Sequence, residues 1–209
     1  IVDFNREWKV LSQTFSRRSV IRLLGEEGYR KRRLMPREQN VAVLFCDISG
    51  FTRLSEQVLK EPALIGELIN TWSAKVVQII WNSGGVFDKM VGDCVIGLWG
   101  PPFYEGSARD DCAQAAQAAL NIREYTKRLG DDFPSVAGVE QPIGVASGLN
   151  YCPLFVGLFG PNDDFTGFSS GMNNTARLQG VAACDEILCS DAFVTALSQP
   201  SRFDDERTA

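Results

Sequence analysis

Residues 41–52 read VAVLFCDISGFT, and the predicted fold is built around this stretch. Its first half, Val41–Cys46, is apolar at every position, which is typical of a central strand that is covered on both faces of a sheet. Its second half places Asp47 directly after the strand and leads through Ser49 and Gly50 into a helical pattern. The stretch therefore predicts a buried strand, a tight connection and a helix, with one carboxylate at the connection.

The chain beyond this stretch alternates between helical and extended patterns. Ser83-Gly84-Gly85 is typical of a helix end, and Gly92-Asp93 is typical of a tight hairpin. The predicted elements, in chain order, are a helix over residues 54–79 that is interrupted near Pro62, strands over 86–91 and 94–99, a helix over 110–129 that is capped by Gly130, strands over 143–149 and 154–159 that are joined by 150–153, a strand over 165–168, a helix over 173–179 and a strand over 186–190. The order β-α-β-β-α-β with further C-terminal strands predicts an α+β fold, a ferredoxin-like sandwich.

The length of 209 residues allows one domain with a short flanking segment. Residues 1–40 are polar, with a weak helical pattern and a basic cluster, Arg30–Arg33, which we interpret as a solvated face. The predicted organisation is a connecting arm over 1–40 and one domain over 41–209. Because the first residue is Ile1 and not methionine, we expect a piece of a longer protein, with a sensor or regulatory domain outside it.

Composition excludes several classes of site. The 21 basic and 26 acidic residues give a net charge of −5, which argues against a surface for nucleic acid or anionic membranes. The sequence contains no histidine, so triads, general bases and zinc or haem sites that need histidine are excluded. The six cysteines form no CxxC pair and most lie in apolar runs. We therefore expect free thiols in a reducing compartment, and a cytoplasmic domain of a longer protein with or without a membrane anchor elsewhere.

Two carboxylates follow strands at positions that the predicted fold can bring together. Asp47 has an ordinary explanation as a helix cap, and Asp93 has one as a turn residue. In a β-α-β-β unit the first strand pairs beside the hairpin, so both carboxylates can lie at one end of the sheet. Two carboxylates without histidine suit Mg²⁺ or Mn²⁺, held beside a phosphate at a helix start. Capping and metal binding are both open at this point.

Three segments resemble motifs of the class III nucleotidyl cyclases. Val43–Thr52 resembles the first metal-binding motif of this family, and Gly84–Asp93 resembles the second, with its K-x-x-G-D ending. Phe165-Thr166, followed by Asn173–Leu178, resembles the third motif, usually written V-N-x-A-x-R. The resemblance runs from about residue 40 to 190, and three motifs in the right order are far more specific than any one of them.

The resemblance implies a metal and phosphate site around the first two motifs. Asp47 and Asp93 would bind two Mg²⁺ or Mn²⁺ ions, with Ile48 as a further residue of the metal site. The backbone groups that would hold the β- and γ-phosphates belong to Ile48, Ser49, Gly50, Phe51 and Thr52.

The resemblance also implies the contacts to the rest of the nucleotide. Lys89 would hydrogen-bond the purine base, with Thr166 as its partner. Asn173 would orient the ribose, and Arg177 would stabilise the charge on the phosphate in the transition state. Members of the family form dimers with active sites at the subunit interface, so a homodimer with two equivalent sites is implied.

The identities of Lys89 and Thr166 favour ATP as the substrate. Adenine has an acceptor at N1 and a donor at N6, which suit a lysine donor and a threonine acceptor, whereas guanylyl cyclases of this family usually have glutamate at the lysine position. The chain thus resembles the Lys/Thr subclass of bacterial and soluble adenylyl cyclases. The expected reaction converts ATP to 3′,5′-cyclic AMP and pyrophosphate, assisted by two metal ions.

Two features depart from the usual pattern of the family, and other functions stay open. Ala146 stands where the family often has arginine, and no lysine after Ser190 matches the distal lysine that contacts phosphate in some relatives. The alternatives are a guanylyl cyclase that uses GTP on the same scaffold and a non-catalytic cyclase-like dimerisation module. A diguanylate cyclase is disfavoured because its GG[D/E]EF signature is absent.

Overall fold

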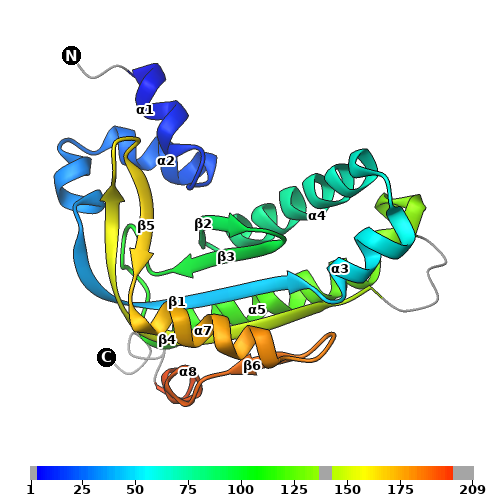
Figure 1. Cartoon of the computed structure of the whole chain (residues 1–209). Coiled ribbons are helices and arrows are strands. Elements are labelled where there is room, and N and C mark those ends of the chain that lie inside the picture. The colour runs from blue at the N-terminus through cyan, green and yellow to red at the C-terminus, as the bar shows by residue number, and fades with distance from the viewer. Residues whose placement is uncertain (1–3, 137–142, 200–209) are drawn as a thin grey trace.

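One mixed sheet lies at the centre of the computed structural model, which describes residues 4–136 and 143–199 (Figure 1). Its strands are β1 (Arg37–Ile48), β2 (Val86–Val91), β3 (Cys94–Trp99), β4 (Val145–Phe159), β5 (Asp164–Phe168) and β6 (Ile187–Cys189). Five strands run in the order β2-β3-β1-β4-β5, and β6 pairs with β4 in parallel. The first four strands have the arrangement of a ferredoxin-like sandwich, and two strands are added at the C-terminal end, so the predicted fold class is confirmed.

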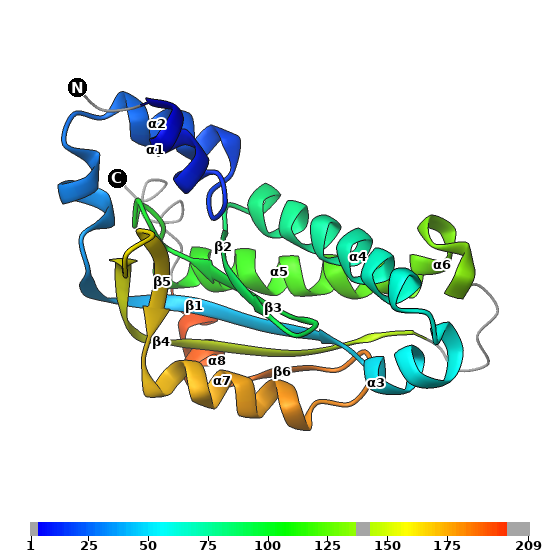
Figure 2. The ribbon, with the colours of Figure 1, turned by 45° about the horizontal axis from the view of Figure 1, so that its top comes forward.

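Helices lie on both faces of this sheet (Figure 2). They are α1 (Phe4–Leu11), α2 (Arg17–Gly25), α3 (Phe51–Arg53), α4 (Pro62–Asn82), α5 (Ala108–Lys127), α6 (Leu129–Asp132), α7 (Ser170–Val181) and α8 (Asp191–Leu197), with π-helical turns over Arg30–Leu34 and Leu54–Leu59 and a 3₁₀ turn over Pro134–Val136. Helices α4 and α5 share one core with the sheet, and α1 and α2 belong to a second. Within the described residues, no helix has the length and apolar character needed to cross a membrane.

Strand β1 is buried on both faces because its alternate residues belong to these two cores. Ala42 and Leu44 pack with side chains of α4 and α5, including Trp72. Val41 and Val43 pack with side chains of the N-terminal helices. Successive residues of a strand point to opposite faces, so the unbroken apolar run is what this central position requires.

Strand β4 is longer than the sequence predicts. The strands expected over 143–149 and 154–159 form one continuous strand, and the connection expected over 150–153 is wrong. Pro153 lies opposite Asn40 in the pairing with β1, which continues without a break. Proline is tolerated where its nitrogen faces no partner strand, and in the described chain the outer edge of β4 is unpaired between the β6 and β5 ladders. Pairing with β1 therefore overrides the local turn signal.

The N-terminal segment packs against the sheet, whereas the sequence suggested a polar connecting arm. Helices form here, and β1 begins at Arg37, inside the expected arm. The basic cluster is partly engaged, because Arg30 forms ion pairs with Glu7 at 2.8 Å and with Asp163 at 3.1 Å. The apolar side chains of this segment that are buried include Leu11, Phe15, Val20, Leu23 and Leu34. They are too sparse to give a clear helical period, so only the packed structure shows their role.

Helix ends agree with the sequence at some places and differ at others. Gly84 and Gly92 have positive φ angles of 81° and 64°, as the predicted helix end and hairpin turn require. Helix α5 begins with a capping box between Ser107 and Asp110. Gly130 lies inside α6 and does not cap α5, and the short helix α8 was not predicted.

Helix α7 lies directly against β4 at Gly148. A Cβ atom at this position would be 2.6 Å from the backbone nitrogen of Gln179 and 2.7 Å from the backbone oxygen of Thr175. Both atoms belong to the helix backbone and cannot rotate away as a side chain could. The absence of a side chain at residue 148 therefore allows α7 to pass this close to the sheet.

We expect Gly148→Ala to lower the free energy of unfolding by about 1–3 kcal/mol, because α7 has to move away from β4. Gly66→Ala is the matched control, since Gly66 lies within α4 and has open space around its Cβ position. Alanine there should raise the free energy of unfolding by about 0.5–1 kcal/mol through helix propensity. Urea unfolding followed by circular dichroism measures both changes. Wild-type stability of Gly148→Ala would contradict the close contact of α7.

Candidate active site

The two predicted carboxylates lie at one end of the sheet. Asp47 is the penultimate residue of β1, and Asp93 is in the two-residue turn between β2 and β3. Strand β1 pairs with β3 so that Cys46 lies opposite Val95, which puts the hairpin turn beside the end of β1. The structure thus brings together two carboxylates that are 46 residues apart in the chain.

Three oxygen atoms at this end of the sheet are buried without a partner. Within the described residues, Asp47 Oδ1, Asp93 Oδ2 and Ser49 Oγ have no hydrogen bond. Asp47 and Ser49 also line an open hollow of about 450 Å³. Unpaired buried oxygens of this kind fit a hard divalent cation, which takes oxygen ligands. Within the described residues, no group of three or more acidic or cysteine side chains is placed to hold a metal ion.

The acidic pair is electrostatically strained. Burial raises the pKa of the Asp47 carboxyl to about 7, and the neighbouring Asp93 contributes to this rise, because it accepts a hydrogen bond from the protonated Asp47 and repels the ionised form. The Ile48 N–H and the Gln179 side chain act in the opposite direction. Burial and the two carboxylates also raise the pKa of the Cys94 thiol to about 12, so this thiol stays neutral and oxygen atoms are the available donors.

The connection from Ile48 to Thr52 turns into α3 through Gly50, whose φ angle is 72°. The Ser49 N–H donates to the Gly144 carbonyl at 2.9 Å, so this one backbone donor of the predicted phosphate cradle is already in use. The Phe51 and Thr52 backbone opens the short helix α3. The local turn into a helix is therefore formed as the sequence predicted, and the phosphate contacts of this segment stay a prediction.

The hollow that Asp47 and Ser49 line, called the acidic hollow from here on, is also lined by residues of β4 and α7. Ala146 lies directly opposite Asp47 in the β1–β4 pairing, so the usual arginine of the family would stand beside this carboxylate. Gln179 lines the same hollow and interacts with the Asp47 carboxyl. Sequence reasoning missed Gln179, because only the close approach of α7 at Gly148 places it here.

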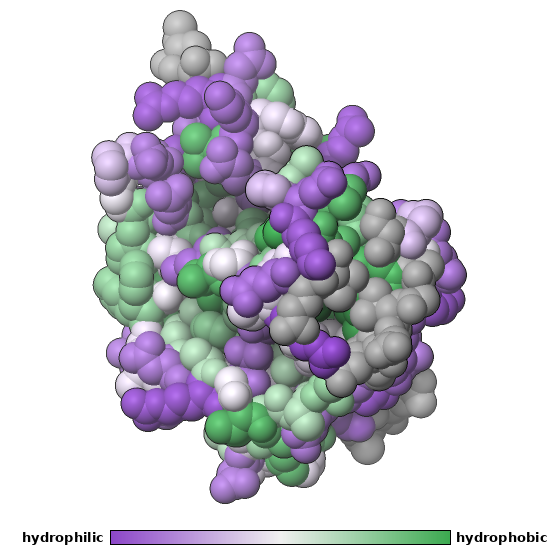
Figure 3. All heavy atoms as spheres, turned by 45° about the vertical axis from the view of Figure 1, so that its right-hand side comes forward, coloured by the Kyte–Doolittle hydropathy of each residue, from purple (hydrophilic) through white to green (hydrophobic). Residues whose placement is uncertain are grey.

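A second hollow, of about 370 Å³, contains the predicted base contacts. Lys89 on β2 and Thr166 on β5 both line it, and Lys89 Nζ donates to Thr166 Oγ1 at 2.8 Å. Lys89 Nζ also lies 5.4 Å from the centre of the Phe168 ring. The volume is within the range of small-molecule sites. Figure 3 shows that the surface is recessed below the N-terminal helices, which form the purple group at the top.

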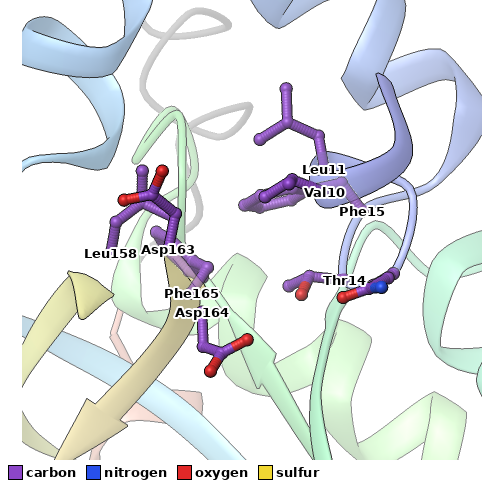
Figure 4. Close-up of a pocket in the computed structure, with 9 residues that line it drawn as sticks. Val10, Leu11, Thr14, Phe15, Leu158, Asp163, Asp164 and Phe165 are labelled. Atoms are coloured by element: carbon purple, nitrogen blue, oxygen red, sulfur yellow. The ribbon is translucent and has the colours of Figure 1, made fainter. Parts of the chain in front are cut away.

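The N-terminal segment completes this second hollow. Gln13 and Thr14 line it, and the Thr14 carbonyl accepts hydrogen bonds from the Phe87 N–H at 3.1 Å and from Trp81 Nε1 at 2.9 Å. Figure 4 shows Thr14 and the neighbouring Phe15 across from Asp164 and Phe165, at the start of β5. The cavity in that view has room for about 10 Å³, one water molecule at most, so it is a packing gap and not a ligand site. No sequence signal marks this contact.

Asn173 and Arg177 lie apart from both hollows. They are one helical turn apart on α7, and both side chains are exposed. Arg177 Nη1 contacts Asn174 Oδ1 at 3.4 Å, on its own helix. Neither residue is among those that line the two hollows. The described chain thus brings the two carboxylates together and brings Lys89 together with Thr166, and it leaves the other two predicted residues facing outward.

The family model described as the adenylate and guanylate cyclase catalytic domain matches residues 34–208. An adenylate cyclase from Anabaena cylindrica is 28% identical over 172 residues, which are 79% of this chain and 32% of that protein. The chain therefore spans about a third of the length of this curated relative.

Solved structures of nucleotidyl cyclases also match this chain. The adenylyl cyclase CyaB from P. aeruginosa superposes with a TM-score of 0.71 at 30% identity, over 78% of this chain and 83% of that one. The guanylyl cyclase Cya2 superposes with a TM-score of 0.70 at 21% identity, over 78% and 81%, which shows a shared fold. With three motifs, the fold and a family match over most of its length, this chain belongs to the class III nucleotidyl cyclases.

Proposed function

We propose that this chain is the catalytic domain of an adenylyl cyclase, which converts ATP to 3′,5′-cyclic AMP and pyrophosphate as a homodimer. The observation that carries the choice of ATP is the 2.8 Å hydrogen bond between Lys89 Nζ and Thr166 Oγ1 inside the 370 Å³ hollow. These residues are 77 positions apart in the chain and meet where a base can lie. The adenylyl cyclases among the relatives support the same choice.

The hydrogen-bonding groups of this hollow are complementary to adenine. The Lys89 ammonium has only donors, which suit the acceptor at adenine N1. The Thr166 oxygen can accept from the amino group at C6. Guanine has a donor at N1, which would face the ammonium, and a buried donor without a partner costs about 1–3 kcal/mol.

The acidic pair is proposed to hold two Mg²⁺ or Mn²⁺ ions. Asp47 and Asp93 would supply the carboxylate ligands, with the Ile48 backbone beside them. When bound, such ions lower the pKa of the attacking ribose hydroxyl and neutralise the departing phosphates. The chain itself contributes the fixed spacing of the carboxylates and the backbone groups of residues 50–52 for the phosphates. Binding would also relieve the repulsion within the pair.

The outward-facing Asn173 and Arg177 support a dimeric site. An exposed, planar guanidinium on α7 is available to a nucleotide that is held by the acidic pair of a second copy. Asn173, one turn away, is proposed to orient the ribose of the same nucleotide. The reacting oxygen and phosphorus belong to one molecule, so the task of the protein is to hold it in an in-line geometry.

We also propose that the domain works in the cytoplasm under an upstream sensor or regulatory domain. All six cysteines are unpaired, which supports a reducing compartment. The curated relative is about three times as long as the matched region. With a net charge of −5, no nucleic-acid partner is proposed.

Substrate choice is tested with the purified domain and Mn²⁺. We expect kcat/KM to be at least about tenfold higher for ATP than for GTP, as one mismatched buried hydrogen bond predicts. Lys89→Glu should erode this preference, because glutamate accepts from guanine N1 and N2. Lys75→Glu is the matched control, since Lys75 lies on α4 and lines neither hollow. An equal or higher kcat/KM for GTP in the unmodified protein would leave the guanylyl alternative standing.

The dimeric site is tested by mixing two inactive variants. Asp47→Ala and Arg177→Ala should each be inactive, and their mixture should recover about a quarter of wild-type activity, because half of the dimers are mixed and each has one complete site. Arg177→Ala alone should lower kcat by roughly 100-fold or more with little change in KM. No recovery, in samples where mixed dimers are shown to form, would contradict a shared site.

The raised pKa of Asp47 predicts that the stability of the metal-free protein depends on pH in an unusual direction. The pKa of Asp47 is about 7 in the folded protein and near 3.8 in the unfolded chain, so the folded state binds this proton more tightly. The melting temperature in EDTA should therefore fall as the pH rises from 5 to 8. Asp93→Asn should melt higher than wild type at pH 8 and show a weaker pH dependence, because the repulsion is gone.

The Asp93→Asn variant also tests whether Asp93 binds the metal ion, independently of its effect on stability. Mn²⁺ should raise the melting temperature of the wild type and have little effect on Asp93→Asn. Asp131→Asn, which removes an exposed carboxylate on α6, should behave as wild type in both measurements. A full response of Asp93→Asn to Mn²⁺ would remove this carboxylate from the ligand set.

A further inference from the structure

Asp88 is a buried carboxylate that the proposed function leaves unused. It lies on β2 beside Lys89, and its side chain is 0% exposed. The pairing of β2 with β3 skips this residue: Phe87 is opposite Gly97, and Lys89 is opposite Ile96. Successive residues of a regular strand face opposite sides, whereas this bulge lets Asp88 and Lys89 line the same hollow.

Asp88 is also costly to the fold. Within the described residues, neither of its carboxylate oxygens has a hydrogen bond of normal geometry, and the nearest cation is Lys89 Nζ at 3.6 Å. Burial raises the pKa of Asp88, and the Thr166 hydroxyl, the Lys89 ammonium and the Gly167 N–H oppose this rise. A buried charge with incomplete pairing destabilises a protein, so a contribution to folding stability does not explain why an aspartate stands at this position.

The position of Asp88 limits what it can do. Its side chain is covered, so it acts on a ligand only through the groups beside it. Asp88, Lys89 and Thr166 line one hollow, and Lys89 Nζ, which lies 3.6 Å from Asp88 Oδ2, joins the carboxylate to the Thr166 hydroxyl. This hydroxyl has one hydrogen and two lone pairs. Lys89 Nζ donates to one lone pair at 2.8 Å. The remaining question is whether the hydroxyl hydrogen points toward the ligand or toward the protein.

We propose that Asp88 is a positioning residue that draws the hydrogen of the Thr166 hydroxyl toward its carboxylate, so that Thr166 presents only a lone pair to the ligand. A carboxylate accepts hydrogen bonds and never donates them, so it fixes the direction of the hydroxyl. The hollow then favours a purine with an amino group at C6 and disfavours one with a carbonyl there. This inference rests on the proposed function and adds the origin of its specificity.

Asp88→Asn tests this with two substrates that differ only at C6. The variant keeps the shape of the side chain. Its amide can donate a hydrogen bond to the Thr166 oxygen, which turns the hydroxyl hydrogen toward the ligand. We expect kcat/KM for ATP to fall about tenfold or more, mainly through KM, which is the scale of one hydrogen bond. For purine riboside triphosphate, which has no group at C6, the change should stay within about threefold. The ratio of GTP to ATP turnover should rise.

Two further variants distinguish this role from a structural one. In a Thr166→Val background, Asp88→Asn should have no further effect on ATP, because the hydroxyl that it orients is gone. Asp111→Asn is the matched control: it removes another largely buried carboxyl, on α5, that does not line the hollow, and both substrates should respond equally. Asp88→Asn should also melt at the same or a higher temperature than wild type, since a buried charge is removed.

An equal loss of ATP and purine riboside triphosphate turnover in Asp88→Asn would overturn the proposal. If this variant does not fold, Asp88→Ser carries the same comparison. If the wild type prefers GTP, the proposed function fails, whereas the dependence of the Asp88→Asn effect on the C6 group still decides the role of Asp88. If the domain does not turn over, calorimetric dissociation constants of the two triphosphates replace kcat/KM.

Discussion

Strand β1 has a partner on each edge and an apolar layer on each face, so it cannot slide along its axis without breaking two ladders and two cores. This constraint fixes the position of Asp47 along the sheet. The register with β3 brings Asp93 beside it, and the register with β4 sets Ala146 opposite it. The geometry of the acidic site is thus a consequence of core packing, although none of its polar atoms contributes to that core.

The sequence predicts best those parts whose signals are local. The all-apolar run of β1 and the Gly92-Asp93 hairpin carry their own signals, and both form as expected. The continuity of β4 through Pro153 was not predictable in this way, because the partner strand decides it. The packing of the N-terminal helices was missed for a similar reason, since their few apolar residues gain meaning only against the sheet.

The same distinction holds for the site. Motif residues such as Asp47, Asp93, Lys89 and Thr166 were predicted from the sequence, and the structure brings them together in pairs. Gln179 was not found, because only the contact at Gly148 brings it to the acidic hollow. The bulge that buries Asp88 beside its neighbour breaks the alternation on which a strand prediction relies. Tertiary contacts and irregular strand pairing therefore determine which other residues lie beside the motif residues.

Both hollows contain carboxylates that burial makes unfavourable, and this is expected where binding matters more than stability. In the acidic hollow a cation can offset the repulsion directly. In the second hollow, which contains Lys89 and Thr166, the proposed distinction is finer, because adenine and guanine have almost the same shape and differ in the direction of their hydrogen bonds. A hydroxyl alone can match either direction, so it discriminates only when something covered from the ligand fixes its hydrogen. A buried acceptor beside that hydroxyl meets this requirement, and its unfavourable burial is then the physical basis of the selectivity that we propose.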